Sequence, residues 1–206
     1  MAIRVAATCL VLVVLALFAA AVSADPPHVT SASQELRRTL DEVFVVAQSP
    51  GFRQLEPAER RRVVRKLTDR LFNWSEVAKR AMGPYWNQRS VVERRKLAEG
   101  FASLAERAYI GPVEQIGHRR VPTNAIRYGG ETTSGDETVV HTVFAYPREL
   151  PVDFVMSKRA RTWEVCDVRV DGVSATENYR AQLDRVMAAG SFPDVVARMS
   201  AKQSAP

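Results

Sequence analysis

Residues 163–180 read WEVCDVRVDGVSATENYR, and this stretch decides the fold class. Its first half is rich in β-branched and aromatic side chains, which is typical of a strand. The Asp-Gly pair at 171–172 has turn chemistry, and Ser174 followed by Glu177 has the spacing of a capping box that opens a helix. The stretch therefore predicts a sheet that leads directly into a helix, and it contains no metal-ligand cluster and no phosphate-binding loop.

The part of the chain before this join is helical as far as about residue 116. Apolar residues recur there at every third or fourth position, so each helix has one face to bury. We expect Ser33 to cap a first helix, Pro57 to begin a second and Ser75 a third, while Ser90 with Glu93 opens a long fourth helix.

The apolar pattern then changes to the two-residue repeat of strands. Residues 139–146 and 152–157 alternate in this way, and a weaker strand is expected at 124–128, with the turn after it marked by the glycines at 129–130 and by 134–136. Strands that follow one another without intervening helices pair antiparallel. We therefore predict an α+β fold: a curved antiparallel sheet of about four strands, packed with a helical N-terminal half and with C-terminal helices from Ser174 to about Ala189 and from near Ser191.

The first residues are typical of a secretion signal. Arg4 gives a positive start, residues 9–22 form an apolar run, and small residues at 22–24 suit a signal peptidase. The run is shorter than the roughly 20 residues that cross a bilayer. We predict a signal peptide at residues 1–24 and one exported, soluble domain at residues 25–206, with Cys166 as its single cysteine and no internal disulfide.

Positive charge is concentrated in two places. The formal net charge is +6, and basic residues crowd residues 60–70 and 94–96. In an exported protein such clusters favour lipid phosphate or an acidic protein partner over nucleic acid. A solvated helix face is the alternative for any one of these arginines.

Catalytic and metal-binding motifs are missing from the sequence. His28, His118 and His141 are far apart and have no ligand-like spacing, so no metal, no catalytic residue and no cofactor is predicted. One enzymatic alternative stays open: His141 could meet Asp167 on another strand and act as a general base in a small α+β enzyme. A strand histidine with a local hydrogen bond is the competing interpretation.

The strands carry apolar residues on both faces. Strict alternation places Trp163 and Val165 on the opposite face from Cys166, Val168 and Val170. A sheet that is apolar on both sides needs cover on both, from helices or from a bound apolar ligand.

Two motifs resemble a known family. Residues 74–86, WSEVAKRAMGPYW, followed by the charged residues at 93–95 and by Phe101, resemble the helix, Gly-x-Tyr/Trp and Phe pattern of the MlaC-type (toluene-tolerance) periplasmic phospholipid-binding proteins. Residues 163–168, leading through 172–174 to 178–180 and Gln182, resemble the C-terminal signature of the same family. The resemblance covers about residues 33–200.

The resemblance implies a soluble periplasmic carrier and not an enzyme. Such a carrier moves phospholipid between the outer membrane and an inner-membrane ABC-transporter complex, and so maintains the lipid asymmetry of the outer membrane. The implied partners are a phospholipid as cargo, the substrate-binding component of the transporter complex and an outer-membrane lipoprotein/porin complex. We expect a monomer that binds no nucleic acid and no cofactor.

On this interpretation the acyl chains lie in a pocket between the sheet and the helices. Its predicted residues are apolar or aromatic: Phe101, Leu104, Val143, Phe144, Phe154, Met156, Trp163, Val165 and Tyr179. Which of Val143 and Phe144 faces the pocket is left open, and Arg80 or Arg180 is expected near the headgroup phosphate. A third possibility is an exported adaptor without ligand, which would use the basic helix at residues 60–70 as its interface.

Overall fold

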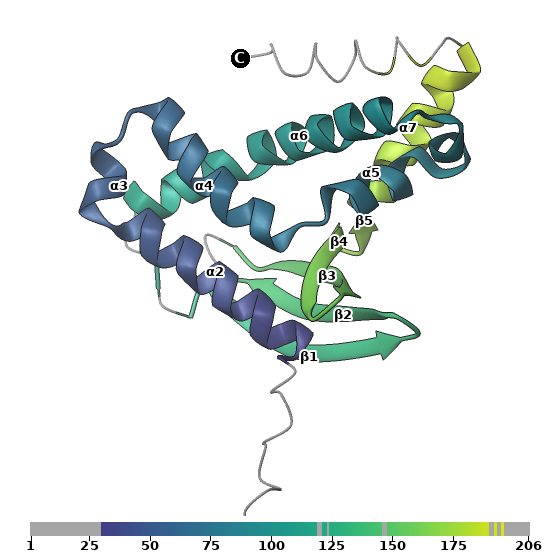
Figure 1. Ribbon diagram of the computed structural model, residues 1–206. Coiled ribbons are helices and arrows are strands. Elements are labelled where there is room, and N and C mark those ends of the chain that lie inside the picture. Colours follow the sequence, from purple (N-terminus) through teal and green to yellow (C-terminus); the bar gives the residue numbers. More distant parts are fainter. Residues whose placement is uncertain are drawn as a thin grey trace, which may run out of the picture. The chain divides into compact units, whose positions relative to one another are not determined.

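Helices form the first half of the structured chain and an antiparallel sheet forms its centre (Figure 1). The helices are α2 (Ala32–Gln48), α3 (Pro50–Gln54), α4 (Pro57–Leu71), α5 (Trp74–Met82), the 3₁₀ helix η1 (Gly83–Gln88) and α6 (Val91–His118). The strands β1 (Ile126–Ser134), β2 (Glu137–Phe144), β3 (Leu150–Arg159), β4 (Thr162–Val170) and β5 (Val173–Ser174) follow, and then α7 (Ala175–Ala189). The predicted α+β class is confirmed.

The computed structural model describes residues 30–118, 121–122, 124–145, 148–189, 192 and 195, with backbone alone at 109, 112, 115, 117, 118 and 189. From Ser31 onward these residues belong to one unit. The predicted signal peptide at residues 1–24 lies outside the described residues and stays a prediction. Of the short helix predicted from Ser191, only Phe192 and Val195 are described.

Capping boxes fix the starts of two helices. The Ser90 and Glu93 box at α6 is confirmed, because Glu93 Oε2 accepts from the Ser90 amide at 2.7 Å and Ser90 Oγ accepts from the Glu93 amide at 3.3 Å. Helix α2, however, is capped by Ser31 and not by the predicted Ser33. Gln34 explains the difference: its Oε1 accepts from the Ser31 amide at 2.9 Å, which completes a box at that position.

The middle helices begin close to their predicted positions. Pro57 is the first residue of α4, as expected. Helix α5 begins at Trp74, one residue before the predicted Ser75, because Asn73 Oδ1 accepts from the Glu76 amide at 3.0 Å and serves as the cap.

The sheet is a meander in the order β1-β2-β3-β4-β5, and every neighbouring pair is antiparallel. It has five strands, of which β5 has only two residues. Strand β1 is longer than predicted: it continues through the glycines at 129–130, and the turn follows at Gly135. A bulge between Tyr128 and Gly130 absorbs the glycine pair instead of ending the strand.

A second bulge changes which residues of β4 face the helices. Around Cys166, strand β4 carries one residue more than β3. An extra residue reverses the alternation beyond it. Val165 and Trp163 therefore share a buried cluster with Val168, although strict alternation placed them on opposite faces.

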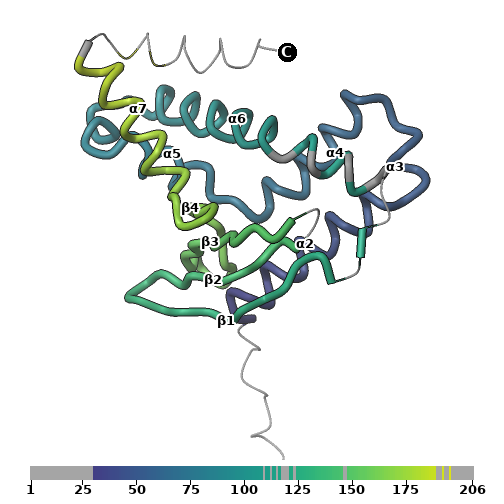
Figure 2. Tube along the Cα trace, turned by 180° about the vertical axis from the view of Figure 1, so that it is seen from behind, coloured from purple at the N-terminus to yellow at the C-terminus, as the bar shows by residue number. Residues whose placement is uncertain are grey.

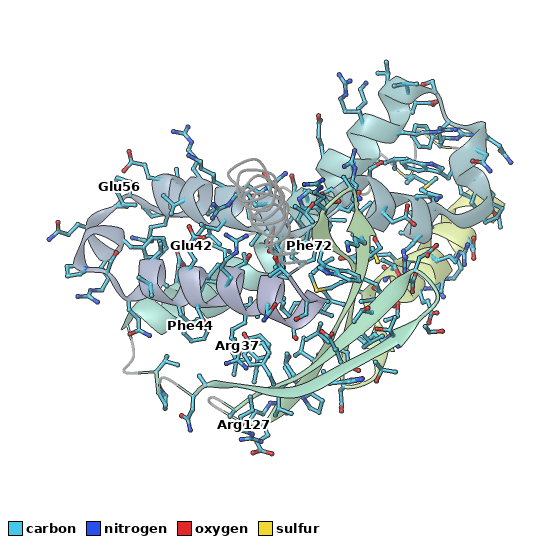
Figure 3. All side chains as sticks on the ribbon, turned by 60° about the horizontal axis from the view of Figure 1, so that its bottom comes forward. Arg37, Glu42, Phe44, Glu56, Phe72 and Arg127 are labelled. Carbon is cyan, nitrogen blue, oxygen red and sulfur yellow. The ribbon has the colours of Figure 1, made fainter. Side chains whose placement is uncertain are left out.

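Three clusters of buried apolar residues hold the helices and the sheet together. One joins α5, η1, α6 and α7, a second joins α2 to one face of the sheet, and a third joins α2, α3, α4 and α6. Figure 2 shows the same arrangement from behind, with α5 and α7 beside the first half of α6. On the sheet side, Arg37 reaches from α2 toward β1, where its guanidinium carbon lies 4.0 Å from the centre of the Tyr128 ring (Figure 3).

Candidate functional site

The described residues enclose a cavity of about 520 Å³ between the helices and the sheet. This volume lies within the range of about 300 to 1,000 Å³ that is typical of ligand pockets. The wall is mostly apolar, and its residues come from α2, α4, α5, α6 and α7, from strands β2, β3 and β4, and from connections between elements: Thr39, Leu40, Val43, Phe44, Thr68, Leu71, Phe72, Trp74, Val77, Phe101, Leu104, Ala105, Ala108, Val113, Ile116, Val121, Ala125, Phe144, Phe154, Asp167, Val168, Val170, Ala175, Thr176 and Tyr179. Among these described wall residues, Asp167 alone carries a charged side chain.

One face of α6 forms a large part of the wall. Phe101, Leu104, Ala105 and Ala108 recur at the three- and four-residue spacing that places them on one side of a helix. The two alanines leave space that larger side chains would fill. Phe101 also meets the ring of Tyr179 on α7 edge to face, with ring centres 5.4 Å apart.

The sheet contributes aromatic side chains from neighbouring strands. Phe144 of β2 and Phe154 of β3 have ring centres 6.5 Å apart and both line the cavity. Alternation along β2 then puts Val143 on the opposite face of the sheet, away from the cavity. Of the two candidates Val143 and Phe144, it is Phe144 that lines the cavity.

Five of the nine predicted pocket residues thus line the cavity: Phe101, Leu104, Phe144, Phe154 and Tyr179. Val143, Met156, Trp163 and Val165 do not. Met156 and Val165 are 0% exposed and pack in the cluster beneath α2, so protein side chains already surround them. Trp163 is half-buried at the start of β4, where the Lys158 ammonium lies 5.7 Å from its ring centre.

Helices α2 and α4 line the cavity although no residue of either was predicted there. Leu40, Val43 and Phe44 come from α2, and Leu71 from α4. Their helical spacing was visible in the sequence, but an apolar stripe has the same spacing whether it faces a solid core or a cavity. Phe44 and Phe72 are labelled in Figure 3.

The short connection between α4 and α5 adds two stacked rings to the wall. Phe72 and Trp74 stack with centres 4.5 Å apart and planes 5° from parallel. Trp74 Nε1 donates to Asp69 Oδ1 at 2.7 Å, and the Asn73 amide donates to the carbonyl of Val165 at 2.9 Å. These bonds tie the connection to α4 on one side and to the sheet on the other.

The carboxylate of Asp167 in this wall is fully engaged with the protein. Asp167 is 5% exposed, its Oδ2 accepts from Ser174 Oγ at 2.6 Å and its Oδ1 accepts from the Thr176 amide at 3.0 Å. Ser174 Oγ also accepts from the Glu177 amide at 3.1 Å. The Thr176 amide in the first turn of α7 and the Ser174 hydroxyl just before it thus satisfy this buried carboxylate.

The proposed pairing of His141 with Asp167 is not formed. His141 Nδ1 lies 3.0 Å from Asp153 Oδ1, and its Nε2 lies 3.1 Å from Thr132 Oγ1. In the register of the sheet His141 is opposite Asp153, while Asp167 is opposite Val155. The histidine therefore has the local strand contacts that the competing interpretation expected.

The two arginines expected near a phosphate lie away from the cavity wall. Arg80 pairs with Glu137 of β2 and, at 3.4 Å, with Glu76 of its own helix. Arg180 lies against Gly83, where a Cβ atom would overlap its guanidinium. The described part of the wall contains no lysine or arginine.

The described residues provide neither a metal site nor a membrane-spanning helix. They contain no group of three or more His, Cys, Asp or Glu that could hold a metal ion. None of their helices combines the length and apolar character that membrane crossing requires. Burial raises the pKa of the Cys166 thiol to about 11, so this cysteine stays protonated near neutral pH.

Together, the fold and the cavity define a class of protein: an α+β domain whose helices and antiparallel sheet enclose an apolar, ligand-sized space. Residues 37–201 match the family described as MlaC protein. This match spans most of the chain, and the chain belongs to the MlaC family, as its two motifs predicted.

A solved structure has the same fold. It is the phospholipid-binding protein from Ralstonia solanacearum in complex with a phospholipid, which aligns with a TM-score of 0.70 at 20% identity over 84% of this chain and 97% of that chain. At this identity the likeness concerns the fold. No curated protein matches the chain.

Proposed function

We propose that this protein binds phospholipid and carries it, with the acyl chains in the cavity beside α6. The observation that carries the proposal is the cavity itself, which is ligand-sized, lined mostly by apolar side chains and free of lysine and arginine in its described wall. Membership of the MlaC family supports it, and so does the phospholipid bound to the Ralstonia solanacearum protein.

The energetics of acyl chains explain why a carrier of this kind would need an enclosed apolar site. Two chains of about 15 methylenes each, at about 0.8 kcal/mol per buried CH₂, correspond to roughly 24 kcal/mol of gross transfer free energy. Release into water is therefore negligible, and lipid has to pass directly from one apolar site to another. The apolar wall of the cavity would provide that site.

The finer proposal places this carrier in the periplasm as a monomer. It would shuttle phospholipid between an outer-membrane lipoprotein/porin complex and the substrate-binding component of an inner-membrane ABC-transporter complex, and catalyse no reaction. The secretion signal predicted at residues 1–24 supports export. The headgroup would lie outside the apolar wall, because the described part of that wall offers no basic partner for a phosphate.

Filling the cavity tests the proposal. Ala105 lines the cavity, so Ala105→Trp places an indole where an acyl chain would lie. We expect at least about a tenfold loss of co-purifying lipid, because excluded chains lose their burial free energy. Native mass spectrometry followed by solvent extraction measures the lipid carried per protein.

Ala58→Trp is the matched control. Ala58 is exposed on α4 and is not part of the wall, so this variant keeps wild-type lipid. Ala108→Trp repeats the test from one turn further along α6, and thermal unfolding shows that each variant is folded. Wild-type lipid content in both folded cavity variants would contradict the proposal.

A further inference from the structure

The first turn of α6 exposes two neighbouring valines. Val91 is 73% exposed and Val92 is 63% exposed. Single exposed apolar residues such as Val45, at 72%, are ordinary on protein surfaces, whereas adjacent ones form a patch that water solvates poorly. Neither valine belongs to the cavity wall, so the proposed lipid site does not account for them.

Basic side chains adjoin the valines. Arg95 and Lys96 each follow a valine by four residues, so all four side chains lie on one side of the helix. Both cations are exposed, and neither forms an ion pair with an acidic residue in the described part of the chain. We call Val91, Val92, Arg95 and Lys96 the α6 patch.

The acidic side chains near this patch leave its positive charge largely uncompensated. Glu93 Oε2 accepts a hydrogen bond from the Ser90 amide at 2.7 Å, and Glu93 Oε1 lies 3.8 Å from Arg89 Nη1. Glu99 is exposed one turn beyond Arg95. Within residues 89–96 there are four basic side chains and one acidic side chain.

The patch is presented by a rigid part of the structure. The Ser90 and Glu93 capping box fixes the first turn of α6, and Leu97 is buried beneath it. Arg94 donates to the Trp86 carbonyl at 3.2 Å and its guanidinium carbon lies 5.3 Å from the centre of the Trp86 ring. The backbone that carries the valines and cations is therefore held in place by the rest of the structure.

We propose that the α6 patch docks the protein on the surface of an anionic lipid bilayer. The valines would enter the boundary between headgroups and acyl chains, while Arg95 and Lys96 face lipid phosphates, which is the division of roles in interfacial helices. A protein partner fits less well, because tight protein interfaces centre on aromatic anchors in pockets and this patch offers two small aliphatic side chains.

The position of the patch leaves the cavity free. None of the four patch residues lines the cavity: Phe101, the first wall residue of α6, follows Lys96 by five residues, which corresponds to about 7.5 Å along the helix at about 1.5 Å per residue. Two valines and a few cations give weak, reversible attachment, as a protein that moves between surfaces requires. The inference does not depend on lipid in the cavity, so each can fail without the other.

Sedimentation with lipid vesicles at low salt tests the proposal, with the fraction of the full mature protein that binds the vesicles as the measured quantity. We expect binding to vesicles that contain phosphatidylglycerol and not to vesicles of phosphatidylcholine alone. Arg95→Glu with Lys96→Glu should weaken the binding at least about tenfold, and Val91→Ser with Val92→Ser about fivefold. Added salt should weaken wild-type binding, since it screens the attraction.

Matched controls separate the α6 patch from net charge and from general apolar exposure. Arg61→Glu with Arg62→Glu makes the same charge change on α4, and Val45→Ser removes an equally exposed valine from α2; both should bind like wild type. All variants should keep their co-purifying lipid, which distinguishes this result from failure of the proposed function. Equal loss in the α4 control, equal binding to phosphatidylcholine, or no binding at all would overturn the inference.

Discussion

Gly83 shows how one residue joins two helices of this fold. It ends α5 with φ of 51° and ψ of −126°, a combination that L side chains rarely adopt. The Arg180 side chain of α7 lies directly over it, in the space that a Cβ atom would need. Glycine is therefore required here both for the backbone conformation and for the close approach of α7.

Gly83→Ala should lower the free energy of unfolding by about 1 to 3 kcal/mol, the cost of a strained backbone conformation, with displacement of Arg180 adding to it. Gly51→Ala is the control, because Gly51 lies in α3 and no atom lies within 4 Å of the position that a Cβ atom would take. This variant should change the free energy of unfolding by less than about 1 kcal/mol. Urea unfolding of both variants measures the difference. Equal effects would show that neither the conformation nor the contact with Arg180 matters.

At the scale of elements, the sequence predicted that a strand leads into α7 and where this helix starts. It did not predict the bulge in β4 or the hydrogen bonds between Asp167 and the start of α7. The spacing of Ser174 and Glu177 predicted the helix start, and Ser174 Oγ does accept from the Glu177 amide at 3.1 Å. The bulge at Cys166 was not predictable, because it depends on the register with β3. The bonds of Asp167 to the start of α7 likewise exist only after the hairpin has folded.

Asp167→Ala should be one of the most destabilising polar substitutions in the described chain. It leaves the buried Thr176 amide and Ser174 hydroxyl without their acceptor, at about 1 to 3 kcal/mol for each group. Asp167→Asn keeps one acceptor and should cost about half as much. Asp153→Ala removes the carboxylate that His141 meets on a more exposed surface and should cost less than about 1 kcal/mol.

Urea unfolding ranks these three variants, and thermal unfolding in the presence of extracted lipid shows whether the α7 wall of the cavity is still in place. An Asp167→Ala protein as stable as Asp153→Ala would mean that the carboxylate does not anchor α7.

The candidate site illustrates the same division between local pattern and tertiary structure. The face of α6 with Phe101 and Leu104 was predictable from periodicity alone. Met156 and Val165 are as apolar as the residues that line the cavity, and only their position beneath α2 makes them core. Composition and spacing identify which side chains are buried, but the empty space among them depends on how separate elements pack.

At the scale of the whole molecule, a cavity of about 520 Å³ lowers the stability of the folded state, and a bound ligand can offset that loss. Side chains around an empty apolar space lose the contacts that close packing would give them. A ligand that binds only the folded state adds stability in proportion to the logarithm of its concentration relative to its dissociation constant. Phospholipid and fold should therefore be thermodynamically linked.

Removal of lipid should lower the melting temperature and expose the cavity to apolar dyes. At a lipid concentration 100 times the dissociation constant the linkage is about 2.7 kcal/mol, which corresponds to a shift of about 5 to 10 °C for a domain of this size. Calorimetry of the native and the delipidated protein, followed by addition of phospholipid, measures the shift and its reversal. The Ala105→Trp protein is the informative control, because an indole that fills the cavity makes its melting temperature insensitive to lipid. If the delipidated protein melted at the native temperature and bound no dye, the cavity would not be the lipid site, since occupation of that space has to stabilise the walls that enclose it.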